Sequence, residues 1–223
     1  MNLIEYPDTD LMMMDVADAL AGALKSALLT HERVTFAVPG GSTPGPVFDI
    51  LSAVHLDWDR VTILPSDERW VPPEHARANA RLIRERLLKD AASAATFQPL
   101  YVAETEVDAA LGPLAETVAP LLPLDVLMLG MGMDMHTASL FPGADGLADA
   151  LGHDAPPVVA TRPASQPEAR VSLSGPVLQG ALNTHVVMTG TGKRDVLQKA
   201  SKLQPIEAPI QIVLTNATLH WAP

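Results

Sequence analysis

The stretch "LDVLMLGMGMDMHTASLFPG", residues 124–143, decides the fold prediction. An apolar run, "LDVLMLG", ends at a glycine and is followed within a few residues by polar side chains that include Asp134 and His136. Such a run is typical of a buried strand that carries its carboxyl end to the surface of an α/β protein. Ligands bind beyond the carboxyl ends of the strands in open α/β sheets. The stretch therefore predicts both a fold class and a binding edge.

Strand-like and helix-like segments alternate along the rest of the chain. The predicted strands cover 33–38, 60–65, 124–130, 157–161, 169–174, 184–190 and 210–215. The predicted helices cover 9–29, 43–54, 79–91, 107–122 and 192–202. This alternation predicts a single α/β domain over residues 1–223, with a mostly parallel, modified Rossmann-like sheet and helices on both faces. The segment 143–168 is expected to be a long loop or flap that carries one strand.

The composition excludes several classes of partner. The 223 residues carry a formal net charge of −11, which argues against binding nucleic acid or an anionic membrane surface. An anionic small substrate would need a locally positive pocket. The chain has no cysteine, which excludes disulfides and thiolate metal sites and suits a reducing compartment. Because the first ten residues lack Lys and Arg, we expect no secretory leader and a cytoplasmic protein.

The first polar motif is "FAVPGGSTPGPVFDIL", residues 36–51. A predicted strand ends before Gly40 and Gly41, and Ser42 and Thr43 then open a predicted helix. Unpaired backbone N–H groups at a helix N-terminus favour anions, so the motif predicts a phosphate site. The alternative is an ordinary strand–helix turn in which Ser42 and Thr43 only cap the helix.

The second motif is "DER", residues 67–69, which follows the next predicted strand. Asp67 and Arg69 should lie at the same edge of the sheet as the glycine turn, which favours a role in binding. The alternative is a surface ion pair. Asn79, at the start of the following helix, is a candidate cap or ligand.

The third motif, "TGTGKRDVL" at 189–197, places Lys193 after a strand and a glycine turn. It is not a Walker A loop, because Arg194 stands where that loop has Ser or Thr. A cation at a helix N-terminus is mildly unfavourable, and a bound anion would remove that penalty. Arg170, beside another predicted strand, is a second candidate cation or simply an exposed side chain.

The opening stretch contains "GMGMDM", which resembles part of a dinucleotide-binding fingerprint but has Met135 at the third glycine position. We therefore expect no dinucleotide site. His136 is the side chain suited to acid–base chemistry near neutral pH, and Asp134 is close enough to orient its ring. The alternative is a structural histidine.

In this order, the motifs resemble the 6-phosphogluconolactonase family, which is related to the glucosamine-6-phosphate isomerases. The resemblance covers nearly the whole chain, and "HTASLFPG" at 136–143 is its most specific part. The isomerases carry a catalytic glutamate after their histidine, whereas no acid lies here between His136 and Asp145. Members of the family usually have glycine in place of Met135. If that position needs a positive φ, methionine is strained there, and we expect the local backbone to differ.

The resemblance implies hydrolysis of 6-phospho-D-glucono-1,5-lactone in the oxidative pentose phosphate pathway, with a small sugar phosphate lactone as partner and no metal or organic cofactor. We expect His136 to be the general base, with Asp134 orienting its ring. Arg69 is expected to bind the substrate or the carbonyl oxygen as charge develops, and Asp67 to hold a hydroxyl or Arg69.

The phosphate is expected on backbone amides of the glycine turn, with two cations close by; the predicted phosphate-binding residues are Gly40, Gly41, Ser42, Thr43, Arg170 and Lys193. We expect a monomer or a weak homodimer. Two alternatives stay open at this point: an isomerase or deaminase of the related family, and a non-catalytic regulator that binds a sugar phosphate.

Overall fold

The computed structural model describes residues 2–164 and 166–223, and its centre is a seven-stranded sheet. The strand order is β1–β10–β9–β6–β2–β3–β5, and every neighbouring pair is parallel. The strands are β1 (Asn2–Glu5), β2 (Val34–Val38), β3 (Val61–Pro65), β5 (Thr96–Phe97), β6 (Val126–Gly130), β9 (Asn183–Thr189) and β10 (Ala217–Ala222).

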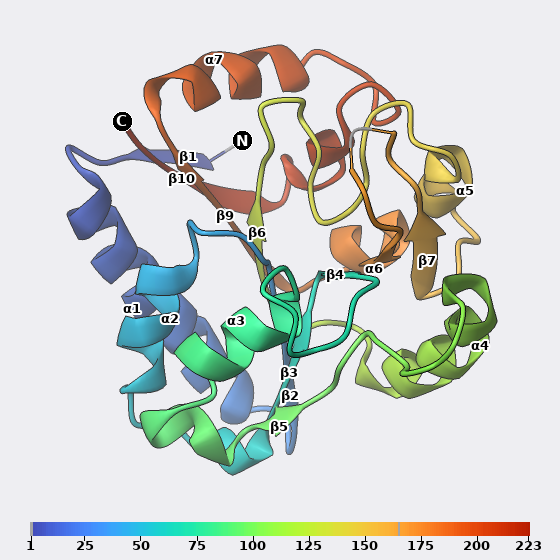
Figure 1. The fold of residues 1–223 in the computed structure, drawn as a ribbon. Helices are drawn as coiled ribbons and strands as arrows, with labels where there is room; N and C mark the ends of the chain where they lie inside the picture. Colours follow the sequence, from blue (N-terminus) through green and yellow to red (C-terminus); the bar gives the residue numbers. More distant parts are fainter. Residues whose placement is uncertain (1, 165) are drawn as a thin grey trace.

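Helices cover both faces of this sheet (Figure 1). The α-helices are α1 (Thr9–Leu28), α2 (Gly45–Ser52), α3 (Asn79–Arg86), α4 (Val107–Val118), α5 (Leu147–Leu151), α6 (Gly175–Gln179) and α7 (Thr191–Ala200). The short 3-10 helices are η1 (Trp58–Arg60), η2 (Asp90–Ala94), η3 (Ala119–Leu121) and η4 (Pro209–Val213). Within residues 2–164 and 166–223, no helix combines the length and hydropathy needed to cross a membrane.

Alternation along the strands builds two hydrophobic cores. On β6, Val126 and Met128 pack with α1, α2 and α3, whereas Leu127 and Leu129 pack with α4, α6 and α7. Successive side chains of a strand point to opposite faces, so a strand covered on both sides must be apolar throughout. This explains the uncharged runs, and the predicted mostly parallel sheet with helices on both faces is confirmed.

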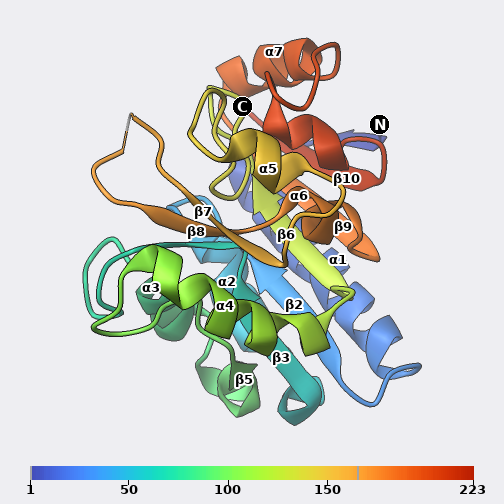
Figure 2. The same ribbon diagram turned by 90° about the vertical axis from the view of Figure 1, so that its right-hand side faces the viewer.

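A second, three-stranded antiparallel sheet has the order β4–β8–β7. Figure 2 shows its strands β7 and β8 beside the large sheet. Its strands are β4 (Asp67–Arg69), β8 (Arg170–Leu173) and β7 (Val158–Thr161). The sequence predicted the strands near 157–161 and 169–174 but placed them in no separate sheet, and it did not predict β4. The segment 143–168 carries β7 as expected and also the short helix α5.

The predicted strand at 210–215 is wrong. Residues Pro209–Val213 form the 3-10 helix η4, and the last strand is β10. Pro209 lacks a backbone N–H and has a φ suited to the first turn of a helix, which explains the difference. Ile210, Ile212 and Val213 are buried, so an apolar run was a sound sign of burial but not of strand structure.

A chain of polar side chains, of which Tyr6 and His220 are buried, joins α1 to β9 and β10. The Tyr6 hydroxyl donates to Asp15 Oδ2 at 2.5 Å and lies 2.8 Å from His220 Nδ1, while His220 Nε2 lies 3.1 Å from His185 Nδ1. Because the proton of Tyr6 goes to Asp15, its oxygen accepts from His220, whose Nε2 then accepts from His185. Burial, together with the neighbouring His185, lowers the pKa of His220 to about 4.

This low pKa makes the stability of the fold depend on pH. In the unfolded chain His220 takes up a proton near pH 6.5, whereas in the folded protein it does so only near pH 4. The free energy of unfolding therefore falls as the pH is lowered from 6.5 to 4. His220→Gln keeps a donor and an acceptor but cannot titrate, and it should flatten the fall by up to about 1.4 kcal/mol per pH unit. Urea unfolding at pH 7, 6 and 5 measures this, with the exposed His153→Gln as control. An unchanged slope in His220→Gln contradicts it.

Candidate active site

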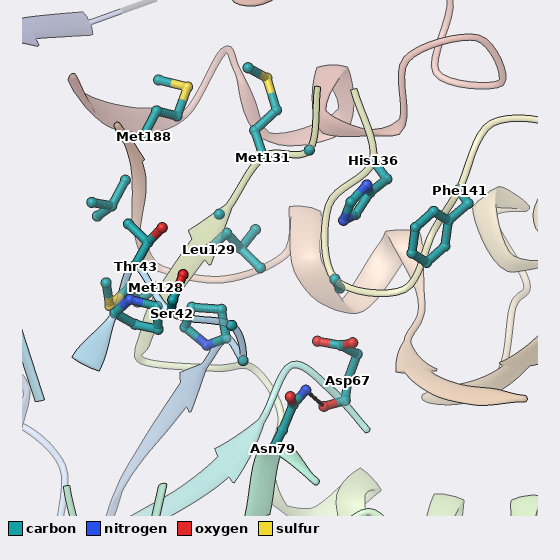
Figure 3. Close-up of a pocket in the computed structure, with 18 of the residues that line it drawn as sticks. Ser42, Thr43, Asp67, Asn79, Met128, Leu129, Met131, His136, Phe141 and Met188 are labelled. Carbon is teal, nitrogen blue, oxygen red and sulfur yellow. Dashed lines mark hydrogen bonds between the residues drawn. The ribbon is translucent and has the colours of Figure 1, made fainter. Parts of the chain in front are cut away.

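The carboxyl ends of β2, β3, β6 and β9 open into one cavity of about 340 Å³ (Figure 3). Its walls come from the glycine turn after β2, the corner between β3 and β4, the loop after β6 and the start of α7. The lining includes nine of the ten predicted site residues: Gly40, Gly41, Ser42, Thr43, Asp67, Arg69, His136, Arg170 and Lys193. The tenth, Asp134, contacts the cavity through His136.

The imidazole ring of His136 contacts a carboxylate at its edge and an aromatic ring on its face. Its Nδ1 lies 2.5 Å from Asp134 Oδ1, and the Phe141 ring stacks on it with centroids 4.1 Å apart. Partial burial raises the pKa of Asp134, but the hydrogen bond and charge of His136 outweigh this effect, so the net pKa lies below its ordinary value. Asp134 is therefore a carboxylate at neutral pH and accepts the Nδ1 proton. In the neutral ring this leaves the lone pair on Nε2.

The loop that carries His136 contains two residues in the left-handed region, Met135 with φ of 69° and Ala138 with φ of 47°. The methionine thus adopts the conformation that favours glycine, instead of shifting the backbone away from it. Its N–H donates to Gly132 O at 3.1 Å, and its carbonyl accepts from Ile210 N at 3.1 Å. Such strain persists where surrounding contacts hold the backbone in place.

The glycine turn has the shape of an anion site without side-chain caps. Gly41 has φ of 89°, and a Cβ on Gly40 would lie 1.8 Å from Asn79 Oδ1, so both positions require glycine. The helix α2 begins after Pro44 with no side-chain hydrogen bond to its N-terminus. Ser42 and Thr43 therefore do not cap the helix, which removes the alternative explanation of the motif.

Lys193 opens α7 and points back across the cavity edge. Its ammonium donates to the carbonyl of Met131, on the loop after β6. Burial lowers the pKa of Lys193, and the charge of Asp134 offsets part of this effect. The cation thus lies in the wall of the cavity that His136 also lines, where it would attract an anionic ligand.

Arg69 and Arg170 face each other across the strand pair β4–β8. The Arg170 guanidinium is buried and donates to Gln166 Oε1 at 2.6 Å, and Arg69 donates to the carbonyl of Arg77 at 2.5 Å. Burial lowers the pKa of Arg170, and the positive charge of Arg69 adds to the decrease. In the part of the chain that the structure describes, the Nε atoms of both arginines are buried without a partner. Two cations side by side in the cavity wall, one of them buried, favour an anionic ligand.

Asp67 has partners other than those predicted. Its Oδ2 accepts from Ser139 Oγ at 2.6 Å and its Oδ1 from Ser66 Oγ at 3.1 Å. Among residues 2–164 and 166–223 it forms no ion pair with Arg69, although both line the cavity. Of the two roles expected for Asp67, an ion pair with Arg69 is not formed among the described residues, and the binding of a substrate hydroxyl stays a prediction.

Glu68 and Asn79 help to build the site but were not among the ten predicted site residues. Glu68 is buried and accepts the backbone N–H groups of Arg69, Asn79 and Ala80 at 2.7–2.8 Å, so it caps α3 from another element. Asn79 donates to the carbonyl of Asp67 at 2.7 Å and lines the cavity (Figure 3). The sequence offered Asn79 as a cap or a ligand. In the structure Asn79 is the first residue of α3, and Ala78 occupies the N-cap position without a side-chain hydrogen bond to the helix.

The sequence matches a known family. A family described as "Glucosamine-6-phosphate isomerases/6-phosphogluconolactonase" matches residues 7–221. The chain belongs to this family. It is 39% identical to a 6-phosphogluconolactonase of Rhizobium meliloti strain 1021, over 100% of this chain and 98% of that protein. A 6-phosphogluconolactonase of Pseudomonas putida is 34% identical, over 98% of this chain and 92% of its own length.

Solved structures agree. The crystal structure of a 6-phosphogluconolactonase from Shewanella baltica OS155 matches with a TM-score of 0.96 and 31% identity, over 100% of this chain and 97% of that one. The family resemblance predicted from the motifs is confirmed, and so is the fold class.

The left-handed backbone of Ala138 gives a test of strain at the site. Ala138→Gly should raise the free energy of unfolding by about 1 kcal/mol, because glycine adopts this φ without a Cβ clash. The matched control is Ala23→Gly in the middle of α1, which should lower it by about 1 kcal/mol. Chemical denaturation of the three proteins measures both effects. A destabilised Ala138→Gly would show that the loop is not strained there.

Proposed function

We propose that the chain, as a single α/β domain, hydrolyses 6-phospho-D-glucono-1,5-lactone to 6-phospho-D-gluconate in the oxidative pentose phosphate pathway. One observation carries the proposal: an imidazole oriented by a carboxylate stands in a cavity that also holds a glycine turn and three cations. The matched relatives from Rhizobium meliloti and Pseudomonas putida are 6-phosphogluconolactonases along nearly their whole length, which supports this substrate.

The phosphate group binds at the glycine turn. Backbone amides from Gly40 to Thr43 and the N-terminal end of α2 favour a dianion, and Lys193 and Arg170 supply charge. The protein as a whole is strongly acidic, so this local cluster of cations makes the cavity favourable for an anionic substrate.

His136 activates the attacking water. Its Nε2 takes a proton as the water oxygen bonds to C1 of the lactone, and the Asp134 carboxylate stabilises the imidazolium that forms. Negative charge develops on the carbonyl oxygen, and Arg69 stabilises it. The bond from C1 to the ring oxygen then breaks, and the imidazolium returns its proton to that oxygen. A δ-lactone is already an activated ester, so positioning and a base suffice, without a covalent nucleophile, metal or organic cofactor.

Removing the base should lower turnover and leave binding intact. His136→Asn, or His136→Ala, should lower kcat by about 10²–10⁴-fold, the usual contribution of a positioned general base. Asp134→Asn should also lower kcat, because an amide that donates to Nδ1 favours the wrong tautomer. Acid release from freshly made lactone, corrected for spontaneous opening, measures these changes. A His136→Asn enzyme with nearly the parental kcat contradicts the assignment.

The phosphate site predicts a different kinetic change. Lys193→Ala should mainly raise KM, by about tenfold or more, since a charge-assisted bond to the phosphate contributes about 1.5–3 kcal/mol. Glucono-1,5-lactone without phosphate should be a poor substrate for the parent. Equal turnover of the two lactones, or a Lys193→Ala variant with unchanged KM, would contradict this site.

The same assays separate the alternatives. An isomerase or deaminase would release ammonia from glucosamine 6-phosphate, whereas no acid lies between His136 and Asp145 to take the role of the isomerase glutamate. A regulator without catalytic activity would bind 6-phosphogluconate but leave lactone opening at the spontaneous rate.

The proposal extends to the surroundings of the enzyme. We place it in the cytoplasm, because a chain without cysteine suits a reducing compartment. We also expect a monomer or a weak homodimer. Light scattering after size-exclusion chromatography measures the oligomeric state.

A further inference from the structure

Ser139 is buried three residues after His136, and it contacts the small sheet through three hydrogen bonds. Its hydroxyl donates to Asp67 Oδ2 at 2.6 Å, and its N–H donates to Ser172 Oγ at 3.2 Å. Its carbonyl accepts from Thr161 Oγ1 at 2.7 Å. Asp67 lies on β4, Ser172 on β8 and Thr161 on β7, so one residue of the loop is joined to all three strands of the sheet.

All four members of this cluster are buried, with Asp67 the most exposed at 6%. A hydrogen bond to a carboxylate is about twice as strong as one between neutral groups. Its loss inside the protein also leaves Asp67 Oδ2 without this donor, so that, in the part of the chain described, only the Ser66 hydroxyl, on Oδ1, still donates to the carboxylate. The contact between Ser139 and Asp67 is therefore the strongest of the three ties.

The small sheet also carries two of the cations. Arg69 and Arg170 are opposite each other on β4 and β8, and both line the cavity. His136, the proposed base, lies instead in the loop that follows β6, and β6 is a strand of the large sheet. The distance between the base and these cations thus depends on how that loop sits against the small sheet.

The first half of the loop has its own ties to the large sheet and its neighbours. Thr137 Oγ1 donates to Gly130 O at 3.0 Å, and Ile210 N donates to Met135 O at 3.1 Å. Ala138, between these ties and Ser139, has the unfavourable φ of 47°. A strained residue tends to relax once a neighbouring tie is lost. Loss of the Ser139 hydroxyl should therefore shift the loop next to His136.

We propose that Ser139 is a positioning residue, which sets His136 against the cations of the small sheet through its bond to Asp67. The proposal rests on the proposed function, since it assigns a role within that reaction. It also assigns Asp67 a second role, as the anchor for the loop of the base. Ser139 does not contact the reacting atoms, and its effect passes through the placement of His136.

Ser139→Ala tests the proposal, with Ser174→Ala as matched control. Ser174 is also fully buried, but within the described part of the chain its hydroxyl has no hydrogen-bond partner. A displacement of about 1 Å lowers the rate about 100-fold, so Ser139→Ala should lower kcat by about 10- to 100-fold. The affinity for 6-phosphogluconate, measured by calorimetry, should stay within about threefold, because the phosphate site is unchanged. Ser174→Ala should keep both values.

Two results would overturn the proposal: a kcat for Ser139→Ala equal to that of Ser174→Ala, or losses of kcat and product affinity in equal proportion. If Ser139→Ala does not fold, Ser139→Cys decides, because a thiol has nearly the shape of the hydroxyl but donates only a weak hydrogen bond to Asp67. It should lower kcat about 3- to 10-fold with unchanged product affinity, and a parental kcat would overturn the proposal. A parent protein that does not accelerate lactone opening overturns the proposed function itself, and is thereby distinguished from these results.

Discussion

The common direction of the strands is the constraint on which the site depends. All neighbours in the large sheet are parallel, so the carboxyl ends of β2, β3, β6 and β9 meet at one edge. Each end delivers a different chemical group: the glycine turn, the Asp67 corner, the His136 loop and the turn before Lys193. An antiparallel order would have sent half of these groups to the opposite edge. The buried, uncharged strands thus determine at which edge of the sheet these polar groups meet.

The small sheet supplies what the large sheet cannot. Arg69 and Arg170 are held in a β-ladder beside the cavity, where backbone pairing orients two like charges that would otherwise repel each other. Glu68 joins β4 to the start of α3, because its carboxylate accepts the backbone N–H groups of Arg69, Asn79 and Ala80. The His136 loop is thus held by hydrogen bonds to both sheets, and supports of this kind are what a precise site geometry requires.

Much of this could be predicted from sequence because the signals are local. Glycine and polar residues after apolar runs located His136, Lys193 and the glycine turn without knowledge of the fold. The small sheet could not be predicted, since β4 and β8 pair across about a hundred residues and β4 is only three residues long. β10 was not predicted because it contains His220, a polar residue whose burial depends on partners from other elements. The role of Glu68 was not predicted because it depends on the amides of Asn79 and Ala80. Such tertiary contacts leave no periodic pattern in the chain.

The proposed reaction requires that the glycine turn, residues 40–43, binds the phosphate so that C1 of the sugar lies at His136. A crystal structure with bound 6-phosphogluconate would show whether it does. We expect the phosphate on the amides between Gly40 and Thr43, and the C1 carboxylate about 3 Å from His136 Nε2. A product bound in the reverse direction, or an imidazole turned toward the protein interior with C1 far from it, would rule out this geometry.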